Sequence, residues 1–279
     1  MRTQLLQWSV LVLGLTAASC SNGPAPPQPG SPAFLWGGAQ TTFRAGDVLR
    51  TGESLQRIIS TDNEFTARAR PWSIVISAGV TQGYLELADA YDVAAKANRA
   101  NPMPFNKEAS ALRSLASSSA LEFAQGVHGF LDKDKDEKVL LAFEYPTGAA
   151  AQPPALARVS SGILIQESER EALKKAMVQR GVLLMLCRVV GSPDDTAKTL
   201  ETMKGPEVRI PRATFMYAVA KALHDESALF GGTKLDRPDR LKMMCTEALE
   251  TLKGVPENKD TKQLMAKIQA SLKKIKGSV

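Results

Sequence analysis

The stretch WSIVISAGVTQGYLELADAYDVAAKAN, residues 72–98, decides the fold class of this chain. Apolar side chains recur along it in steps of three and four residues, which is the spacing of one face of an α-helix. Gly79 and Gly83 lower the helix propensity of its first half and permit a neighbouring helix to approach closely. We predict a helix that ends before Asn101-Pro102, because a residue that precedes proline avoids the α region. The apolar face comprises Ile74, Val75, Ala78, Leu85, Ala88, Tyr91 and Ala95.

Similar periodicity continues through much of the remaining chain. Asp194 or Asp195 can cap a further short helix that runs through Leu200 to Met203. Short connections between the last helices favour antiparallel packing of neighbours. We therefore expect a mostly α fold of antiparallel helix pairs, a helical bundle or short α-solenoid, after a disordered N-terminal tether. The other helical runs are residues 106–130, 167–190, 212–230, 238–253 and 260–276.

A break in this pattern divides the chain into two helical regions. Residues 132–138 form a charged turn, and residues 139–145, VLLAFEY, are the best strand candidate, although a short helix fits them as well. Proline and alanine dominate the residues that follow, as in an irregular linker. The expected organisation is a helical region at 53–131, a charged turn and linker at 132–160, and a second helical region at 161–279.

The residues before the first helical region resemble a tether. Residues 21–32 contain five prolines and no charge, which favours an extended spacer over a packed element. Glycine and threonine are frequent in residues 33–52, so we expect irregular chain there and place the tether at 20–52.

The first nineteen residues have the pattern of a secretory signal peptide. Arg2 is their only charge, an apolar run at 8–15 follows, and small residues precede Cys20. The apolar run is shorter than the roughly 20 residues that a membrane-spanning helix needs.

The residues Ala17-Ala18-Ser19-Cys20 resemble a bacterial lipobox. The resemblance implies that signal peptidase II recognises Ala17, Ala18 and Ser19, and that Cys20 receives a diacylglyceryl group on sulfur and an N-acyl chain such as palmitate. Ala17 replaces the more usual Leu or Val, which is a tolerated departure. The alternative is an unmodified thiol that follows an ordinary signal-peptidase site. Two or more acyl chains give stable membrane attachment without a spanning helix.

The same resemblance implies a location in the bacterial cell envelope. Ser21, rather than Asp, follows the cysteine, and this favours the outer membrane, facing the periplasm or the surface, over the inner membrane. The membrane is then one partner, and envelope proteins are the expected others.

A second, weaker resemblance is to tetratricopeptide-type helical repeats. It covers about 60 residues near the C-terminus, and no 34-residue self-repeat accompanies it. It implies a helical surface that binds other proteins. The segments that carry it are Ala248-Leu249-Glu250-Thr251-Leu252 with Pro256, and Ala88-Asp89-Ala90-Tyr91 with Asn101-Pro102.

Composition and motifs give no support for catalysis. The chain is 44% hydrophobic and 23% charged with a net charge of +6, as in a folded globular protein. Its sequence contains no nucleotide-binding glycine loop, no hydrolase nucleophile elbow and no zinc-protease motif. His128 and His224 are the only histidines and lack metal-ligand spacing. We therefore assign no catalytic residue and expect neither a small-molecule substrate nor a nucleic-acid partner.

The acidic turn is the one weak candidate for a metal site. Asp132, Asp134 and Asp136 match the first three ligand positions of a calcium-binding EF-hand loop. Glu137 occupies the position that requires glycine, and Glu144 comes one residue too late to close the loop. A solvated charged turn is the better interpretation, and we expect no cofactor beyond the acyl chains on Cys20.

Two cysteines remain once Cys20 is acylated. An oxidising periplasm permits a disulfide between Cys187 and Cys245. Both lie in apolar helical runs, where a thiol is simply a small core residue, so both alternatives stay open.

These observations favour a non-catalytic helical scaffold or protein-binding module on a lipid anchor. One alternative is a structural lipoprotein that binds peptidoglycan or anionic lipid through its basic C-terminal helix, since residues 250–279 carry seven lysines and three acids. The other is a periplasmic enzyme that uses scattered acids with His128 and His224.

Intact-mass analysis tests the anchor. The mature polypeptide should start at Cys20 and carry the mass of a diacylglyceryl group and one further acyl chain. Replacement Cys20→Ala should abolish both the acylation and the cleavage. A mature chain that begins elsewhere, or that lacks fatty acids, would refute this assignment.

Overall fold

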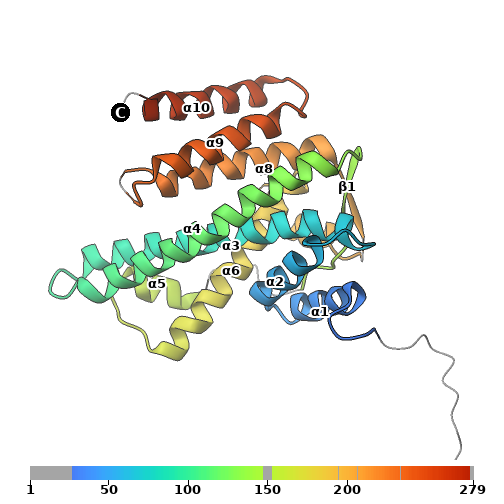
Figure 1. Ribbon diagram of the computed structural model, residues 1–279. Coiled ribbons are helices and arrows are strands. Elements are labelled where there is room, and N and C mark those ends of the chain that lie inside the picture. The colour runs from blue at the N-terminus through green and yellow to red at the C-terminus, as the bar shows by residue number, and fades with distance from the viewer. Residues whose placement is uncertain (1–26, 147–152, 194, 206, 233, 277–279) are drawn as a thin grey trace, which may run out of the picture.

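A hairpin of two long helices, α3 (Thr66–Ala97) and α4 (Met103–Lys133), forms the centre of the molecule (Figure 1). The computed structural model describes residues 27–146, 153–193, 195–205, 207–232 and 234–276. A third long helix, α6 (Glu167–Val189), crosses α3. The helix predicted at 72–98 is confirmed. It begins six residues earlier, at Thr66, and includes Pro71.

The C-terminal helices stack in chain order beside this hairpin. They are α8 (Arg212–Ser227), the short 3₁₀ turn η1 (Ala228–Phe230), α9 (Pro238–Leu252) and α10 (Lys259–Lys276). Figure 1 shows α10 at the edge of the stack, packed on α9. The predicted fold class, mostly α with antiparallel helix pairs, is thereby confirmed. Asp195 caps the short helix α7 (Thr196–Thr202) by accepting a hydrogen bond from the Lys198 amide at 2.9 Å, as predicted.

Described parts of the segment at 132–160 contribute to the core, while its residues 147–152 lie outside the described part of the chain. Strand β1 (Lys138–Leu141) pairs antiparallel with β2 (Val208–Pro211), with Val139 opposite Ile210. The predicted strand is therefore confirmed in its first part, whereas β2 was not predicted. Helix α5 (Pro154–Ser160) packs on α3 and buries Leu156 and Val159. The two helical regions consequently share one continuous hydrophobic core.

Residues 33–52, expected to be irregular, are helical, and this expectation was wrong. They include α1 (Pro32–Arg44) from its second residue onward and the first five residues of α2 (Val48–Ile59). Ser31 and Asp47 cap the two helices, and a cap residue followed by proline at the first helical position is a helix-start signal. The predicted tether therefore ends at residue 31, and its residues 20–26 lie outside the described part of the chain.

An aromatic cluster fixes α1 against α3. The rings of Phe43 and Trp72 lie 4.7 Å apart between centroids, and those of Trp72 and Phe143 lie 4.9 Å apart. Trp36 adds a further contact with Phe143 at 4.8 Å. Buried aromatic side chains contribute large apolar areas, so this cluster explains why the N-terminal residues fold onto the helical body.

Helices α3 and α6 touch through their backbones. A Cβ atom added at Gly79, Gly83 or Gly181 would lie within 3.0 Å of backbone atoms of the other helix. Contacts that short do not occur for real Cβ atoms, so glycine is required at all three positions. The close approach permitted by Gly79 and Gly83 is therefore observed, with Gly181 as its counterpart on α6.

We predict that Gly181→Ala destabilises the protein by roughly 3 kcal/mol, because the two helices must separate to admit a methyl group. Gly129→Ala is the matched control: it lies inside α4, and an added Cβ meets nothing within 4 Å. The control should stabilise the protein by about 0.5–1 kcal/mol, since alanine loses less conformational entropy in a helix than glycine does. Urea unfolding measures both values, and equal effects would contradict the proposed backbone contact.

Candidate binding groove

The residues predicted to direct lipidation, Ala17, Ala18, Ser19 and Cys20, lie outside the described residues. Of the three metal candidates, Asp134 accepts a hydrogen bond from Arg70 Nη1 at 2.9 Å, while Asp132 and Asp136 are exposed. Within the described ranges, no group of three His, Cys, Asp or Glu residues is placed to hold a metal ion.

The two histidines have different neighbours. His128 on α4 is exposed, with Nδ1 3.6 Å from Oε2 of Glu247 on α9. Burial raises the pKa of Glu247, and the neighbouring His128 opposes that shift. His224 on α8 lies with Nε2 3.3 Å from the Ser271 hydroxyl of α10, and burial lowers its pKa. Each histidine thus bridges its helix to a separate partner.

The two cysteines are buried thiols on different helices. Cys187 lies on α6 and Cys245 on α9, and no disulfide joins them in this structure. The Cys245 thiol lies 3.6 Å from the Ser227 hydroxyl, to which it donates a hydrogen bond. Burial raises the pKa of this thiol.

A groove lies between α2, α3, α4 and α6 and is called the α2–α6 groove below. Its larger part has a volume of about 630 Å³ and its smaller part about 350 Å³. Leu49, Tyr84 and Leu115 line both parts, so the two are continuous. Ligand and peptide clefts commonly have volumes of about 300–1,000 Å³.

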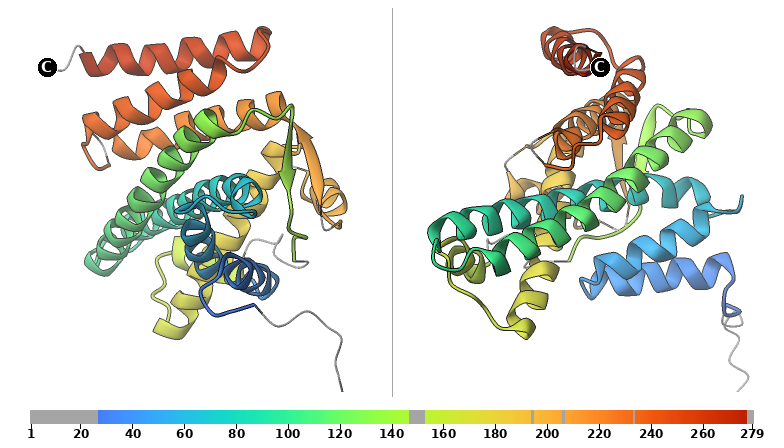
Figure 2. Two further views of the ribbon diagram at one scale, coloured as in Figure 1. Left: turned by 45° about the vertical axis from the view of Figure 1, so that its right-hand side comes forward. Right: turned by 60° about the vertical axis from the view of Figure 1, so that its left-hand side comes forward.

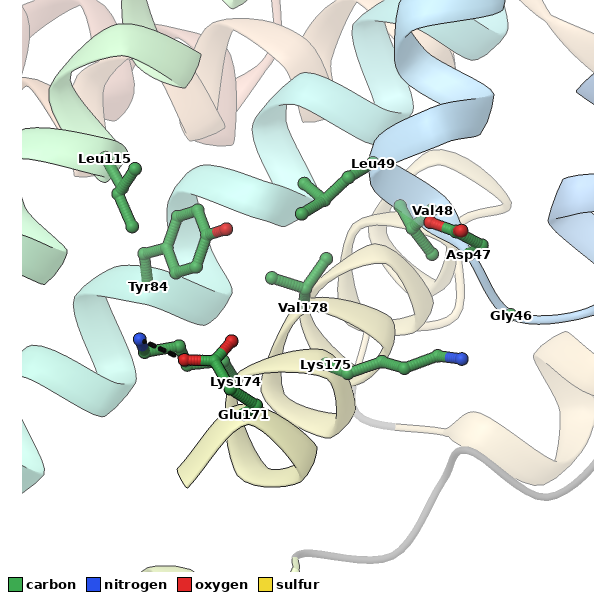
Figure 3. A pocket seen from close by; sticks show the side chains of 10 residues that line it. All are labelled: Gly46, Asp47, Val48, Leu49, Tyr84, Leu115, Glu171, Lys174, Lys175 and Val178. Atoms are coloured by element: carbon green, nitrogen blue, oxygen red, sulfur yellow. Dashed lines mark hydrogen bonds and ion pairs between the residues drawn. The ribbon is translucent and has the colours of Figure 1, made fainter. Parts of the chain in front are cut away.

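Apolar side chains from all four helices converge on the groove. Figure 3 shows Leu49, Tyr84, Leu115 and Val178 around its smaller part. Leu49 is 48% exposed and Leu115 is 44% exposed, so both remain available for contact. The larger part continues over the buried α3 residues Ile76 and Val80, which complete its floor.

Short side chains keep the groove open. Gly52 of α2 and the neighbouring Ser118 and Ser119 of α4 line its larger part. The floor is held in place by the turn between α1 and α2, where the Gly46 carbonyl accepts a hydrogen bond from Gln179 Nε2 of α6 at 2.7 Å. Gly46 has a φ of 69°, which favours glycine.

Polar and charged groups line the rim. Glu53 and Glu122 flank the larger part, while Glu171 and Lys174, 2.8 Å apart, border the smaller part. Burial raises the pKa of Glu122, because the apolar wall removes water from its carboxyl group. Burial also raises the pKa of Tyr84, whose hydroxyl has no hydrogen-bond partner among the described residues and is available to a ligand.

Sequence reasoning did not find this groove. Leu49 lies in the segment expected to be irregular, so it could not be assigned to a helix face. Leu115 lies in the helical run predicted at 106–130, and that periodicity does not tell that its side chain is exposed. Leu49 and Leu115 become neighbours only because α2 and α4 both pack on α3.

A buried acid, Glu226, was also missed. It lies on α8, 4% exposed, and its Oε2 has no hydrogen-bond partner within the described structure. Burial raises its pKa well above the ordinary value, while the Arg188 charge and a hydrogen bond with Thr81 partly oppose the shift. Glu226 therefore stays protonated over a pH range in which an exposed glutamate is ionised.

The chain matches no protein-family model, and no curated protein or solved structure matches it either. Among the described helices, none is both long enough and apolar enough to cross a membrane.

We predict that stability falls as pH rises from the unfolded pKa of about 4.5 towards the raised folded pKa of Glu226. In that window the carboxyl group loses its proton in the unfolded state and keeps it in the folded state. The free energy of unfolding therefore falls by up to about 1.4 kcal/mol per pH unit. Glu226→Gln should remove this loss, whereas Glu64→Gln, at an exposed position, should leave it. Urea unfolding at about pH 5 and pH 8 measures the difference, and an unchanged slope in Glu226→Gln would contradict the prediction.

Proposed function

We propose that this chain is a lipid-anchored protein of the bacterial envelope and acts as a non-catalytic helical scaffold or binding module. The α2–α6 groove is its binding surface, and an apolar, helical segment of another envelope protein is its ligand. The observation that carries the proposal is the convergence of two exposed leucines, Leu49 and Leu115, on one open groove with an apolar floor.

The chemistry of the groove suits a protein segment. Amphipathic helices bind in apolar grooves through side chains spaced three and four residues apart. Covering the exposed halves of Leu49 and Leu115 would contribute about 1 kcal/mol each. The Tyr84 hydroxyl and the rim carboxylates of Glu53 and Glu122 supply polar contacts that fix the orientation of the ligand.

The lipid anchor rests on the sequence from Arg2 to Cys20. Acyl chains on Cys20 would hold the protein at a bilayer, and Ser21 favours the outer membrane. The tether leads directly into α1, which the aromatic cluster fixes to α3. With an anchor at this end, the groove lies on the folded body, and the length of the tether sets its distance from the membrane.

Binding of peptidoglycan or anionic lipid through α10 is the second candidate. Leu264 and Ile268 are buried, whereas Lys259, Lys267 and Lys273 are exposed. These lysines give α10 a basic outer face, and Figure 2 shows the helix at the edge of the fold. None of the large exposed hydrophobic side chains of the described structure lies on α10, so its contacts would be electrostatic.

Photocrosslinking in cells tests the groove. A photoreactive residue at Ser119, on the groove wall, should give a discrete crosslink to another protein. The same residue at Met243, which is exposed on α9, should give none. Leu115→Asp should lower the yield at position 119 at least about tenfold, because a carboxylate would face the apolar ligand.

Leu115 is exposed, so this substitution should leave the fold intact, which circular dichroism verifies. Equal crosslinking at positions 119 and 243, or an unchanged yield in Leu115→Asp, would exclude the groove as the binding surface.

A further inference from the structure

Exposed apolar side chains also gather at the end of the α3–α4 hairpin. Met103 is 75% exposed, Leu164 54%, Val93 52% and Ile163 48%. They comprise half of the large hydrophobic side chains that the described part of the molecule exposes. Val93 belongs to the last turns of α3, Met103 begins α4, and Ile163 and Leu164 lie in the connection between α5 and α6. This end of the molecule is called the hairpin tip below.

The connection between α5 and α6 is fixed to the hairpin by specific contacts. Asn98 Nδ2 donates a hydrogen bond to the Gly162 carbonyl at 3.1 Å. Gly162 has a φ of 83°, and an added Cβ would lie 3.3 Å from the Ala97 Cβ. The backbone next to Ile163 is thus held against the end of α3. Figures 1 and 2 show the α3–α4 turn and this connection at one end of the molecule, with α1 and α2 towards the other end of α3.

Three cations without an ion-pair partner in the described chain surround these apolar side chains. Lys96 and Arg99 are exposed at the end of α3, and Lys107 is exposed one turn beyond Met103 on α4. The acids of the same region are already paired. Asp92 pairs with Arg113 and Glu169 with Arg158, while Glu108 and Glu167 share Arg170.

We propose that the hairpin tip is a membrane-contact surface that inserts its apolar side chains into the interface of an anionic bilayer. Interfacial binding combines apolar burial with attraction of Lys and Arg to anionic headgroups. The tip has both components side by side, whereas α10 has lysines without exposed large apolar groups. Its unpaired charges are all positive, which complements anionic lipid.

This contact is distinct from ligand binding in the α2–α6 groove, and it orients the groove. A body held by its tether near α1 and by the tip at the opposite end of α3 would lie along the membrane. Helix α3 has 32 residues, so at 1.5 Å per residue it is about 48 Å long. Two separated contacts restrict rotation of the body about its anchor.

An environment-sensitive fluorophore on a single introduced cysteine tests the proposal on the full chain. Met103→Cys places the fluorophore at the tip, and Met243→Cys places it at an exposed methionine of α9. Cys187 and Cys245 are 1% and 0% exposed, and the wild-type chain labelled in parallel gives any contribution of Cys20. The comparison of positions 103 and 243 does not depend on acylation, because the two labelled variants have the same N-terminus.

When vesicles of phosphatidylcholine and phosphatidylglycerol are added, the emission maximum of the fluorophore at position 103 should shift to the blue. A quencher in the acyl region should quench it, and position 243 should respond to neither. The triple variant Lys96→Gln, Arg99→Gln, Lys107→Gln should lower the docked-to-undocked ratio about a hundredfold, since each cation near an anionic surface contributes a factor of about five. The control variant Lys133→Gln, Lys198→Gln, Lys242→Gln removes three exposed lysines that lie outside the tip, the groove and α10, and it should not change the ratio.

Three results would overturn the proposal. They are an equal response at positions 103 and 243, an equal response in vesicles of phosphatidylcholine alone, and a loss in the control variant as large as in the tip variant. A tip that instead binds a protein would give the first result in this purified system. Crosslinking at Ser119 is a separate measurement, so failure of the tip and failure of the groove can be told apart.

Discussion

The backbone contact between α3 and α6 is the constraint on which the rest of the structure depends. Gly79, Gly83 and Gly181 leave no room for a Cβ, so the two helices are in van der Waals contact along their main chains. Met177 and Val178 of α6 are thereby brought against Gly83, next to Tyr84 on the groove floor. A larger residue at any of these glycines would separate α6 from the α3–α4 hairpin and widen the α2–α6 groove.

Helix α3 consequently serves three successive purposes along its length. Its first turns hold Trp72 in the aromatic cluster that attaches α1. Its middle supplies Ile76 and Val80 to the groove floor together with the glycines that admit α6. Its last turns carry Val93 and Lys96 at the hairpin tip. The attachment of α1, the groove floor and the hairpin tip therefore follow one another along a single helix.

Most helices could be predicted because each has its own apolar periodicity and its own end signals, such as Asp195 before α7 and Pro102 after α3. The errors have equally specific causes. Residues 33–52 were expected to be irregular on composition, although Ser31-Pro32 and Asp47 are start signals and Trp36 and Phe43 are core residues. Strand β2 has only four residues, and its pairing with β1 depends on a segment about 70 residues away. The groove could not be predicted from the sequence, because its residues come from four helices and become neighbours only when those helices pack.

The sequence by itself determined the helical fold class, the positions of most helices and the lipobox resemblance on which the proposed anchor rests. These are local properties, since periodicity, caps and a short motif are each contained in a few turns of chain. Only the tertiary structure decided which apolar residues remain exposed, which ions pair, that Glu226 is buried, and that Leu49 and Leu115 share a groove. Those properties depend on distances between segments far apart in the chain, which packing of the whole core establishes.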